Sequence, residues 1–527
     1  MAMRWCYLLL LGVVVNFSAS AAERSEFGLT LRSQTPTSAD NIRFQARYDQ
    51  QQWKASETAV IVCDMWNLHH CLNATRRGTE MAPHLNQLLK QSRRQGALII
   101  HAPSSCTAPY KDHPARANAL NAPVASNLPA EIGKWCYSIP SEEQGTYPID
   151  QSDGGEDDDL AEHAAWAKKL AGMGVNPRSP WTKQTDLIDI HDKDVISDNG
   201  EEIWNVLQHA GIKNVVLVGV HTNMCVLGRP FGLRQMAKNG MNVVLCRDLT
   251  DTMYNPKMKP FVSHFTGTDL IVEHIEKWVC PTITSDQILG GKPFVFSTDT
   301  RKHVVILIAE REYRTNESLP RFALEHLGQD YKVTIVHCDE DGQGERNALP
   351  NSIPAITQAD LLLISIRRRV LPQDQLQAVR QHMENGKPVV GIRTANHAFS
   401  LRGESPPEGL VAWEKFDQEI WGGNYANHHG NGKTTTVAAL CQHEILNGLD
   451  LKDFTTIGSL YQVNPLSSST QAILSGTIPD KPMEPIAWTN KTIFGGRAFY
   501  TSLGHIKDFD TKSMNVLLKN AIAWALN

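Results

Sequence analysis

Short apolar runs alternate with segments of helical spacing along two stretches of the chain. In the first stretch, strands are predicted at residues 59–63, 97–100, 215–218 and 241–246, and helices at 83–94 and 201–211. In the second, strands are predicted at 303–308, 333–336, 361–364 and 389–392, with helices at 318–327 and 373–385. Strands and helices that alternate at this pitch are typical of parallel sheets covered by helices. We therefore predict an α/β fold of two three-layer αβα domains, each with a mostly parallel central sheet.

Weakly patterned polar segments lie at the ends of these stretches and give the domain boundaries. Residues 23–57 are polar and form a lead-in, and the run from Gly290 to Thr300 follows the last element of the first stretch. A chain of 527 residues is too long for one ordinary core. We place the two domains at residues 45–291 and 301–527.

The first residues have the pattern of an export signal. Arg4 precedes an apolar run that ends at Val15, and the segment from Ala19 to Ala21 has the small residues of a signal-peptidase site. The run is too short to span a bilayer, and no later stretch is long enough. We therefore predict a signal peptide at 1–22, a periplasmic or secreted protein, and no membrane span after signal removal. The net charge of -5 gives no electrostatic footprint for nucleic acid.

The cysteines do not form a disulfide framework. Ten are present, and removal of Cys6 with the signal leaves nine, without any Cys-x-x-Cys motif. At least one thiol should stay free, and Cys225 is the candidate. One or two disulfides among the others remain compatible with this count.

The long segment from Pro103 to Pro180 interrupts the strand and helix pattern. An insertion of this length in a compact domain is usually a lid or a specificity element. Its acidic run, Asp150 to Asp159, resembles a calcium loop loosely, but Ala161 stands where such a loop needs its closing glutamate. We therefore favour a solvated acidic loop over a metal site.

Cys225 follows a buried strand at a position where a helix can begin. The dipole of a helix N-terminus stabilises a thiolate, so this placement fits a nucleophile, although a small buried hydrophobe is the common alternative. Asp64 and His101 also follow predicted strands, and ligands in parallel sheets bind at the carboxyl ends of strands. These three side chains are therefore expected at one edge of the sheet.

The run from Val218 to Val226 resembles the signature of the isochorismatase-like cysteine hydrolases, and the run from Ala59 to Asn67 is similar to their first strand. Lys183 falls in sequence where their lysine does, and the resemblance covers about residues 55–291. It implies a catalytic triad of Asp64, Lys183 and Cys225, acting on an amide or carbamoyl C–N bond through a thioester.

In the scheme that this resemblance implies, Asp64 takes the thiol proton and returns it to the leaving amine. Lys183 would keep the aspartate and thiolate charged. The backbone N–H groups of Cys225 and His221, the latter across a cis bond between Val220 and His221, would form the oxyanion hole.

Some features depart from the family. The Asp-x-His…His metal cluster of the nicotinamidases is missing after the second strand, although His101, Cys106, Asp112 and His113 lie nearby in sequence. No cofactor is predicted, and a divalent metal stays an open alternative in either domain. His101, Asn223 and Trp181 are the candidates for the substrate pocket.

The second domain resembles the ThuA-like family (trehalose utilisation), a relative of the class I glutamine amidotransferases. The resemblance rests on three stretches: 391–397, 428–431 and 488–505. Thr394 lies near the position where amidotransferases carry their cysteine, so glutamine-dependent amide transfer is not expected. Six side chains either converge on a sugar or metal site or have structural roles: Glu310, Arg393, His397, His428, His429 and His505.

Three functions follow as hypotheses. The first is an exported cysteine-dependent hydrolase of a small molecule, coupled to a domain with a carbohydrate-related role and a carbohydrate ligand. In the second, the ThuA-like domain is the main enzyme and acts on a sugar or keto-sugar. The third is a non-catalytic binding protein. As the families usually associate, we expect a homo-oligomer.

Overall fold

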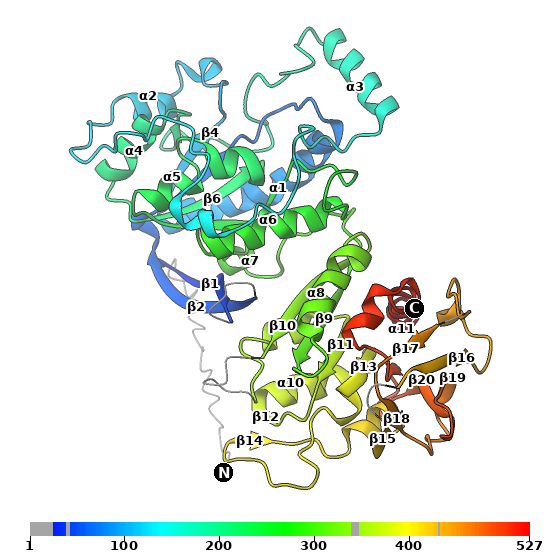
Figure 1. The fold of residues 1–527 in the computed structure, drawn as a ribbon. Coiled ribbons are helices and arrows are strands. Elements are labelled where there is room, and N and C mark those ends of the chain that lie inside the picture. The colour runs from blue at the N-terminus through cyan, green and yellow to red at the C-terminus, as the bar shows by residue number, and fades with distance from the viewer. Residues whose placement is uncertain (1–24, 38–42, 339–346, 431–432, 453) are drawn as a thin grey trace, which may run out of the picture.

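The computed structural model describes residues 25–37, 43–338, 347–430, 433–452 and 454–527. The signal peptide predicted at 1–22 lies outside these ranges. The described chain forms two α/β domains, drawn one above the other in Figure 1, each built around a large sheet. The predicted fold class is confirmed. No helix in these ranges has both the length and the apolar character needed to cross a membrane.

The first sheet has eight strands in the order β2-β1-β8-β7-β6-β3-β4-β5. The six strands from β8 to β5 run parallel, and β1 pairs antiparallel with both β2 and β8. The strands are β1 Glu26–Pro36, β2 Phe44–Lys54, β3 Thr58–Cys63, β4 Leu98–Ala102, β5 Val195–Ile196, β6 Asn214–Val220, β7 Asn242–Asp251 and β8 Thr282–Ile283. All residues of β3 and β6 are buried, as expected for strands covered on both faces.

Helices cover both faces of this sheet. They are α1 Leu72–Gln95, α2 Pro114–Leu120, α3 Leu160–Gly172, α4 Gly200–His209, α5 Leu233–Lys238, α6 His264–Trp278 and α7 Asp286–Leu289. Alternate residues of β3 enter different apolar clusters: Ile61 packs with residues of α4 and α5, whereas Val60 packs with residues of α1 and β1. This period of two puts a core on each face and produces the three layers.

Strands β1 and β2 form a hairpin within residues 23–57, where the weak polar pattern predicted only a lead-in. Its strands pair along their whole length, from Glu26 with Lys54 to Pro36 with Phe44. Only one face of β1 is apolar, with Phe27, Leu29 and Leu31 buried, and most of β2 is polar. The pairing, rather than a hydrophobic run, therefore defines these strands.

The second sheet has nine strands in the order β10-β9-β11-β13-β21-β20-β19-β16-β17. The first five run parallel, and the remaining four are antiparallel additions. The strands are β9 Lys302–Ala309, β10 Tyr331–His337, β11 Leu361–Ile366, β13 Val389–Ile392, β16 Thr435–Ala439, β17 Thr455–Thr456, β19 Gln471–Thr477, β20 Glu484–Lys491 and β21 Arg497–Thr501. Apolar clusters lie on both of its faces.

Helices and two small sheets complete the second domain. The helices are α8 Thr315–Phe322, α9 Ile353–Gln358, α10 Gln373–Glu384 and α11 Lys512–Leu526. One small sheet pairs β12 Leu371–Pro372 with β14 Leu410–Val411, and the other pairs β15 Asn427–His429 with β18 Leu460–Gln462. The two domains touch: β2 contacts β10, and the Ser263 N–H donates to the Gly328 carbonyl at 3.0 Å.

Candidate active site

The carboxyl ends of β3 and β6 bring Asp64 and Cys225 together. These strands are parallel neighbours that end in register, with Cys63 opposite Gly219. Gly219 has φ 103, and a Cβ there would lie 2.0 Å from the Cys63 carbonyl oxygen, so this close approach needs glycine. Asp64 follows β3 with φ 48, and Cys225 sits in a single π-helical turn, Thr222–Val226, after β6.

Asp64 is completely buried and its carboxylate is fully engaged. Oδ1 accepts the Ser104 N–H at 2.7 Å, Oδ2 accepts Nε of Arg229 at 3.1 Å, and the Cys225 thiol lies within hydrogen-bonding reach. Burial raises the pKa of Asp64, and Arg229, Cys225 and Ser104 oppose that rise only in part. An aspartate with a raised pKa is suited to accept a proton and give it back.

The Cys225 thiol is 8% exposed and does not favour the thiolate. Burial raises its pKa well above the ordinary value, the Asp64 charge adds to the rise, and Arg229 opposes it. The expectation of a thiolate stabilised by a helix dipole is therefore wrong. One π turn supplies a small partial charge, which burial and a neighbouring carboxylate outweigh. The resting pair is a protonated thiol beside its proton acceptor.

The cation on Asp64 is Arg229, which the sequence analysis missed. Its guanidinium also reaches Cys225 and lies over the Trp135 ring, 5.3 Å from the centroid. The Arg229 N–H donates to the Cys225 carbonyl at 3.0 Å, so the two residues stand one helical turn apart. A cation four residues after a nucleophile at the start of a helix was the available signal.

Lys183 does not pair with Asp64 in this structure. Its ammonium binds both oxygens of Asp186 at 2.7 Å and is 40% exposed. The neighbouring Gln184 forms a β-bridge with Trp66 and turns its buried side chain inward to His101. Because adjacent side chains of an extended segment point in opposite directions, Lys183 points outward.

The peptide bond between Val220 and His221 is cis, as the resemblance implied. The His221 carbonyl accepts the N–H groups of Met224 and Val226 at 3.0 and 3.1 Å, which closes the turn that carries Cys225. Burial lowers the pKa of the His221 ring to about 4, so this imidazole is neutral at neutral pH.

The three predicted pocket residues have different surroundings. Trp181 stacks on Trp66 at 4.7 Å in an aromatic wall. The side-chain amide of Asn223 binds Gln151 and both backbone groups of Met253, so it ties the nucleophile turn to its surroundings. His101 is fully buried at the end of β4 and bonded to Gln184 and Asp194, so it is a core histidine rather than a pocket residue.

His69 extends the aromatic wall toward the nucleophile turn. Its ring lies 6.2 Å from that of Trp66 and 4.8 Å from that of His221. Burial lowers its pKa well below the ordinary value. The wall beside Cys225 is therefore aromatic and uncharged. His69 was not among the residues predicted from the sequence.

In the second domain, the predicted residues gather around tyrosines. Arg393 follows β13 and lies between the rings of Tyr313 and Tyr461, 4.4 and 4.3 Å from their centroids. His397 lies 4.6 Å from the ring of Tyr425, whose hydroxyl bonds to Nδ1 of His428 at 2.7 Å.

Of the other three residues, His505 and Glu310 contact Tyr313, and His429 lies apart. His505 approaches Tyr313 at 6.3 Å, and buried Glu310 accepts the backbone N–H groups of Tyr313 and Thr315. His429 faces Gln462 and Glu484, because adjacent residues of β15 point to opposite faces.

Family models match both parts of the chain. The isochorismatase domain model matches residues 181–261, and the ThuA model, described as trehalose utilisation, matches residues 304–525. An isochorismatase-like domain precedes a ThuA-like domain. No curated protein matches the chain.

Solved structures resemble the two domains separately. A putative ThuA-like protein from Parabacteroides merdae is 18% identical over 43% of this chain and 90% of its own, with a TM-score of 0.31. A cysteine hydrolase from Pseudomonas syringae pv. phaseolicola is 14% identical over 45% of this chain and 92% of its own, with a TM-score of 0.27. An isochorismatase family protein from Burkholderia thailandensis is 14% identical over 44% of this chain and 93% of its own, with a TM-score of 0.25.

The insertion of the isochorismatase-like domain covers the nucleophile turn. The ring of Trp135 packs so closely on Gly228 that a Cβ there would lie 2.4 Å from it, and the Tyr147 hydroxyl donates to the Asn223 carbonyl at 3.2 Å. A cavity of about 490 Å³ lies between the insertion and the turn. It is lined by Trp135, Tyr137, Tyr147, Gln151, Asn223, Met224 and Arg234. The insertion therefore serves as a wall of this cavity.

Glu142 fastens this insertion to the domain, and acid should release it. Its carboxylate binds Arg234 at 2.7 Å and His274 at 2.9 Å, and hydrogen bonds from these groups lower its pKa to about 2 although burial opposes them. Because the folded pKa is lowered, this stabilisation is present above the unfolded pKa, near 4.5, and is lost as the pH falls toward 2.

We expect Glu142→Gln to lower the free energy of unfolding by about 3 kcal/mol at neutral pH and by much less near pH 2. Urea denaturation at several pH values measures this. Glu143→Gln removes an exposed neighbouring carboxylate and should change little. Equal losses for the two variants at neutral pH would contradict the clamp.

The acidic run of the insertion is a clasp in part, not a solvated loop throughout. The Asp158 carboxylate accepts the N–H groups of Leu72 and Asn73, each at 2.7 Å, at the start of α1. Asp157 binds both terminal nitrogens of Arg77, which also binds Asp251. The side chains of Asp157 and Asp158 are only 8% and 3% exposed, so for them the expectation of solvation is wrong: an N-terminus and an arginine replace the water.

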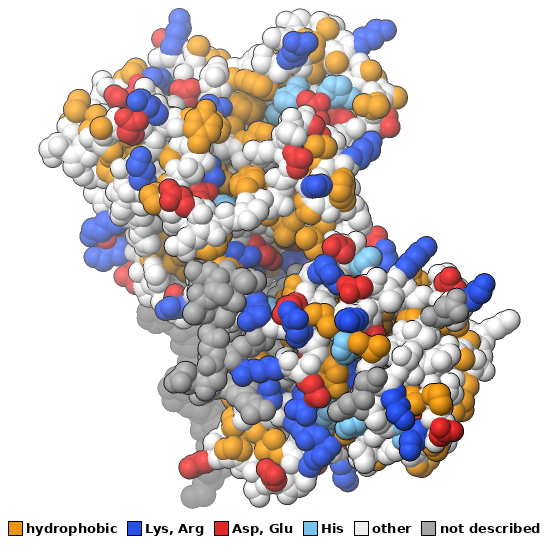
Figure 2. Space-filling view, viewed as in Figure 1, with side chains coloured by type: hydrophobic (Ala, Val, Ile, Leu, Met, Phe, Trp, Pro, Cys, Tyr) orange, Lys and Arg blue, Asp and Glu red, His pale blue; other side chains and the backbone are white. Residues whose placement is uncertain are grey.

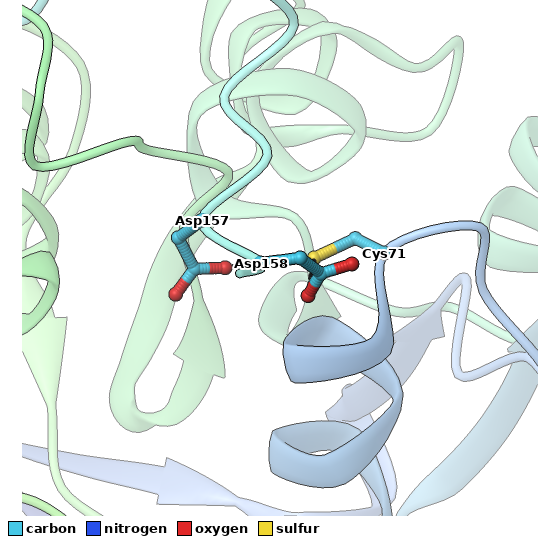
Figure 3. A group of neighbouring side chains, drawn as sticks. All are labelled: Cys71, Asp157 and Asp158. Atoms are coloured by element: carbon cyan, nitrogen blue, oxygen red, sulfur yellow. Dashed lines mark hydrogen bonds between the residues drawn. The ribbon is translucent and has the colours of Figure 1, made fainter. Parts of the chain in front are cut away.

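Cys71, Asp157 and Asp158 bring ligand-type atoms within 4.8 Å of one another (Figure 3). All four carboxylate oxygens already accept hydrogen bonds from the protein. This group therefore fits a structural clasp better than a metal centre. His113, named in the sequence analysis, instead caps α2 with Nδ1.

Proposed function

We propose that the protein is a cysteine-dependent hydrolase that cleaves an amide or carbamoyl C–N bond of a small molecule. The observation that carries this proposal is the set of Cys225, Asp64 and Arg229 that follows two adjacent parallel strands, with the thiol and the carboxylate buried and the guanidinium 25% exposed. If Asp64 were only structural, it would not need the Cys225 thiol as a partner. If the protein only bound a ligand, it would not need a proton acceptor beside that thiol. The isochorismatase domain model, which matches residues 181–261 and so includes Cys225 and Arg229, supports a hydrolase at a coarse level.

The reaction begins with proton transfer from the Cys225 thiol to Asp64. The thiolate sulfur attacks the substrate carbonyl carbon, and the carbonyl electrons move to its oxygen. Backbone N–H groups of Cys225 and His221 are the proposed donors to that oxyanion. As the C–N bond breaks, Asp64 gives its proton to the leaving nitrogen, which leaves a thioester on Cys225.

Water then attacks the thioester, with Asp64 as the base. The acid product leaves and the thiol regains its proton. In this scheme Arg229 has the role that was predicted for Lys183: it keeps the resting Asp64 ionised although that residue is buried.

We also propose that the mature enzyme acts outside the cytoplasm and forms a homo-oligomer.

A panel of primary amides and carbamoyl compounds tests the chemistry. The wild type should release ammonia or an amine from at least one of them, and intact-protein mass spectrometry should detect an acyl adduct on Cys225. Cys225→Ala should lose both signals, whereas Cys441→Ala, which removes a partly exposed thiol of the ThuA-like domain, should keep them. Turnover that survives in Cys225→Ala would refute the proposal.

A further inference from the structure

Arginines gather at the carboxyl edge of the second sheet. Arg367 and Arg368 follow β11, and Arg393 follows β13, and these strands run parallel as direct neighbours. Arg402 lies in the segment that follows. In parallel sheets ligands bind at this edge. Figure 2 shows Lys and Arg side chains gathered on the lower domain with His among them.

Arg393 is a buried cation without an acidic partner. It is 1% exposed, with Nη2 bonded to the Ser459 hydroxyl at 2.8 Å and Nη1 to the Ser502 carbonyl at 2.5 Å. Within the described ranges no carboxylate forms an ion pair with it, and its Nε has no hydrogen-bond partner. An unpaired buried charge is costly, and its field extends into the space beside it.

The other arginines converge on His397. The Arg368 backbone N–H donates to the His397 backbone carbonyl at 3.0 Å, which holds the two segments side by side, and the guanidinium of Arg402 lies over Tyr425, the ring beside His397. Burial lowers the pKa of His397 to about 3, and the charges of Arg368, Arg367, Arg402 and Arg393 add to that effect. Four guanidinium charges therefore act on the His397 ring in addition to burial.

Most of this positive charge is not neutralised by the protein. Arg367 pairs with Glu312 at 2.8 Å, but Arg368 and Arg402 form no ion pair in the part of the chain that the structure describes. Arg368, Arg393 and Arg402 also adopt left-handed backbone, with φ 49, 48 and 62. Residues other than glycine adopt this backbone conformation only at a cost in free energy, and such positions cluster at ligand sites.

A cavity of about 290 Å³ adjoins this cluster. Of the three unpaired arginines Arg402 lines it, together with His397, Tyr425, Asp417 and Glu414. Burial raises the pKa of Asp417 to about 6, and Asn424 and Gln418 add neutral polar groups. Guanidinium groups recognise carboxylates and phosphates, whereas carboxyl and amide side chains bind hydroxyl groups. The volume suits a small molecule.

We propose that Arg368, Arg393 and Arg402, the arginine cluster, form a binding site for a small hydroxylated organic anion in the ThuA-like domain. Arg402, which lines the cavity, contacts the carboxylate or phosphate oxygens, and Arg368 adds positive charge beside it. Arg393 supplies positive potential from beneath, and the polar lining of the cavity binds the hydroxyl groups. This site is separate from Cys225 and does not rest on the proposed hydrolase.

Calorimetric titration of the full chain tests this with three six-carbon probes. Gluconate carries a carboxylate, glucose 6-phosphate carries a phosphate, and glucose is neutral. We expect at least one charged probe to bind, more weakly as NaCl is raised, and glucose not to bind. The stronger charged probe identifies which anionic group the site takes. Failure of both charged probes to bind, or equal binding of glucose, would overturn the proposal.

Matched variants locate the binding. Arg402→Gln should weaken the charged probe by about tenfold or more, because it removes a charge-assisted hydrogen bond, and Arg368→Gln should weaken it by about threefold, because it removes a neighbouring positive charge. Arg497→Gln is the control: it also removes an arginine stacked on an aromatic ring, but at the amino end of β21, on the opposite edge of the sheet. Circular dichroism checks that all variants fold. Binding that survives in both cluster variants, or falls equally in Arg497→Gln, refutes the site.

Discussion

Asp64→Asn should abolish hydrolysis and at the same time make the Cys225 thiol easier to alkylate. Hydrolysis and alkylation change in opposite directions because Asp64 acts on the thiol in two ways. As a base it accepts the proton during the reaction, and its loss should lower the turnover number by about a thousandfold. As a neighbouring negative charge it raises the pKa of the thiol, so its removal lowers that pKa.

The measurement is the rate of iodoacetamide alkylation of Cys225 as a function of pH, beside steady-state turnover of the best substrate. In the wild type the alkylation rate should keep rising above pH 9, and in Asp64→Asn the rise should come at lower pH. Met65→Leu, a volume-conserving change next to Asp64, controls for disturbance of the strand end. If alkylation slows together with turnover, Asp64 only supports the fold of the site.

Arg229→Met should cost far more activity than Lys183→Met. Arg229 pairs with a completely buried Asp64. Without it, burial would be opposed only by the hydrogen bonds from Cys225 and Ser104, so the pKa of that carboxyl would rise further. A protonated Asp64 cannot accept the thiol proton, so we expect a loss of about a hundredfold at neutral pH that shrinks as the pH rises. Lys183→Met removes only an exposed pair with Asp186 and should stay within about threefold.

The pH dependence separates a role in charge from a role in packing. Arg229→Lys keeps the charge and should recover part of the activity, while Arg229→Met should shift the acidic limb of the pH profile upward. A uniform loss at every pH would mean that the stacking of Arg229 on Trp135, rather than its charge, matters. A larger loss in Lys183→Met than in Arg229→Met would restore the predicted triad.

The buried strands were predictable because parallel strands covered on both faces are continuous apolar runs. Residues 59–63 and 215–218 fall inside β3 and β6. The β1–β2 hairpin was not predictable in this way, since Trp53 is the buried residue of β2 and the rest of that strand is polar or partly exposed. Strand β2 is stabilised by pairing with β1, and the pattern of residues within β2 does not reveal that pairing.

The site was predictable to the extent that strand ends determine it. Asp64 and Cys225 follow apolar runs, so sequence alone could bring them to one edge. The partner of Asp64 depended on which way single side chains point: Gln184 turns in to His101, and Lys183 therefore turns out. In the second domain, the left-handed residue after β13 is Arg393, one position before Thr394, and only the backbone shows this.

The contact between β2 and β10 has a consequence for solubility (Figure 1). Each large sheet has one long outer strand, β2 or β10, and one outer strand of only two residues, β5 or β17. Unpaired backbone groups of a long outer strand invite pairing with other chains, whereas a very short strand offers little to pair with. Because the two long outer strands contact each other across the domain boundary, each covers part of the other's edge. A chain divided near residue 300 would therefore yield two halves that self-associate, although each keeps its own core.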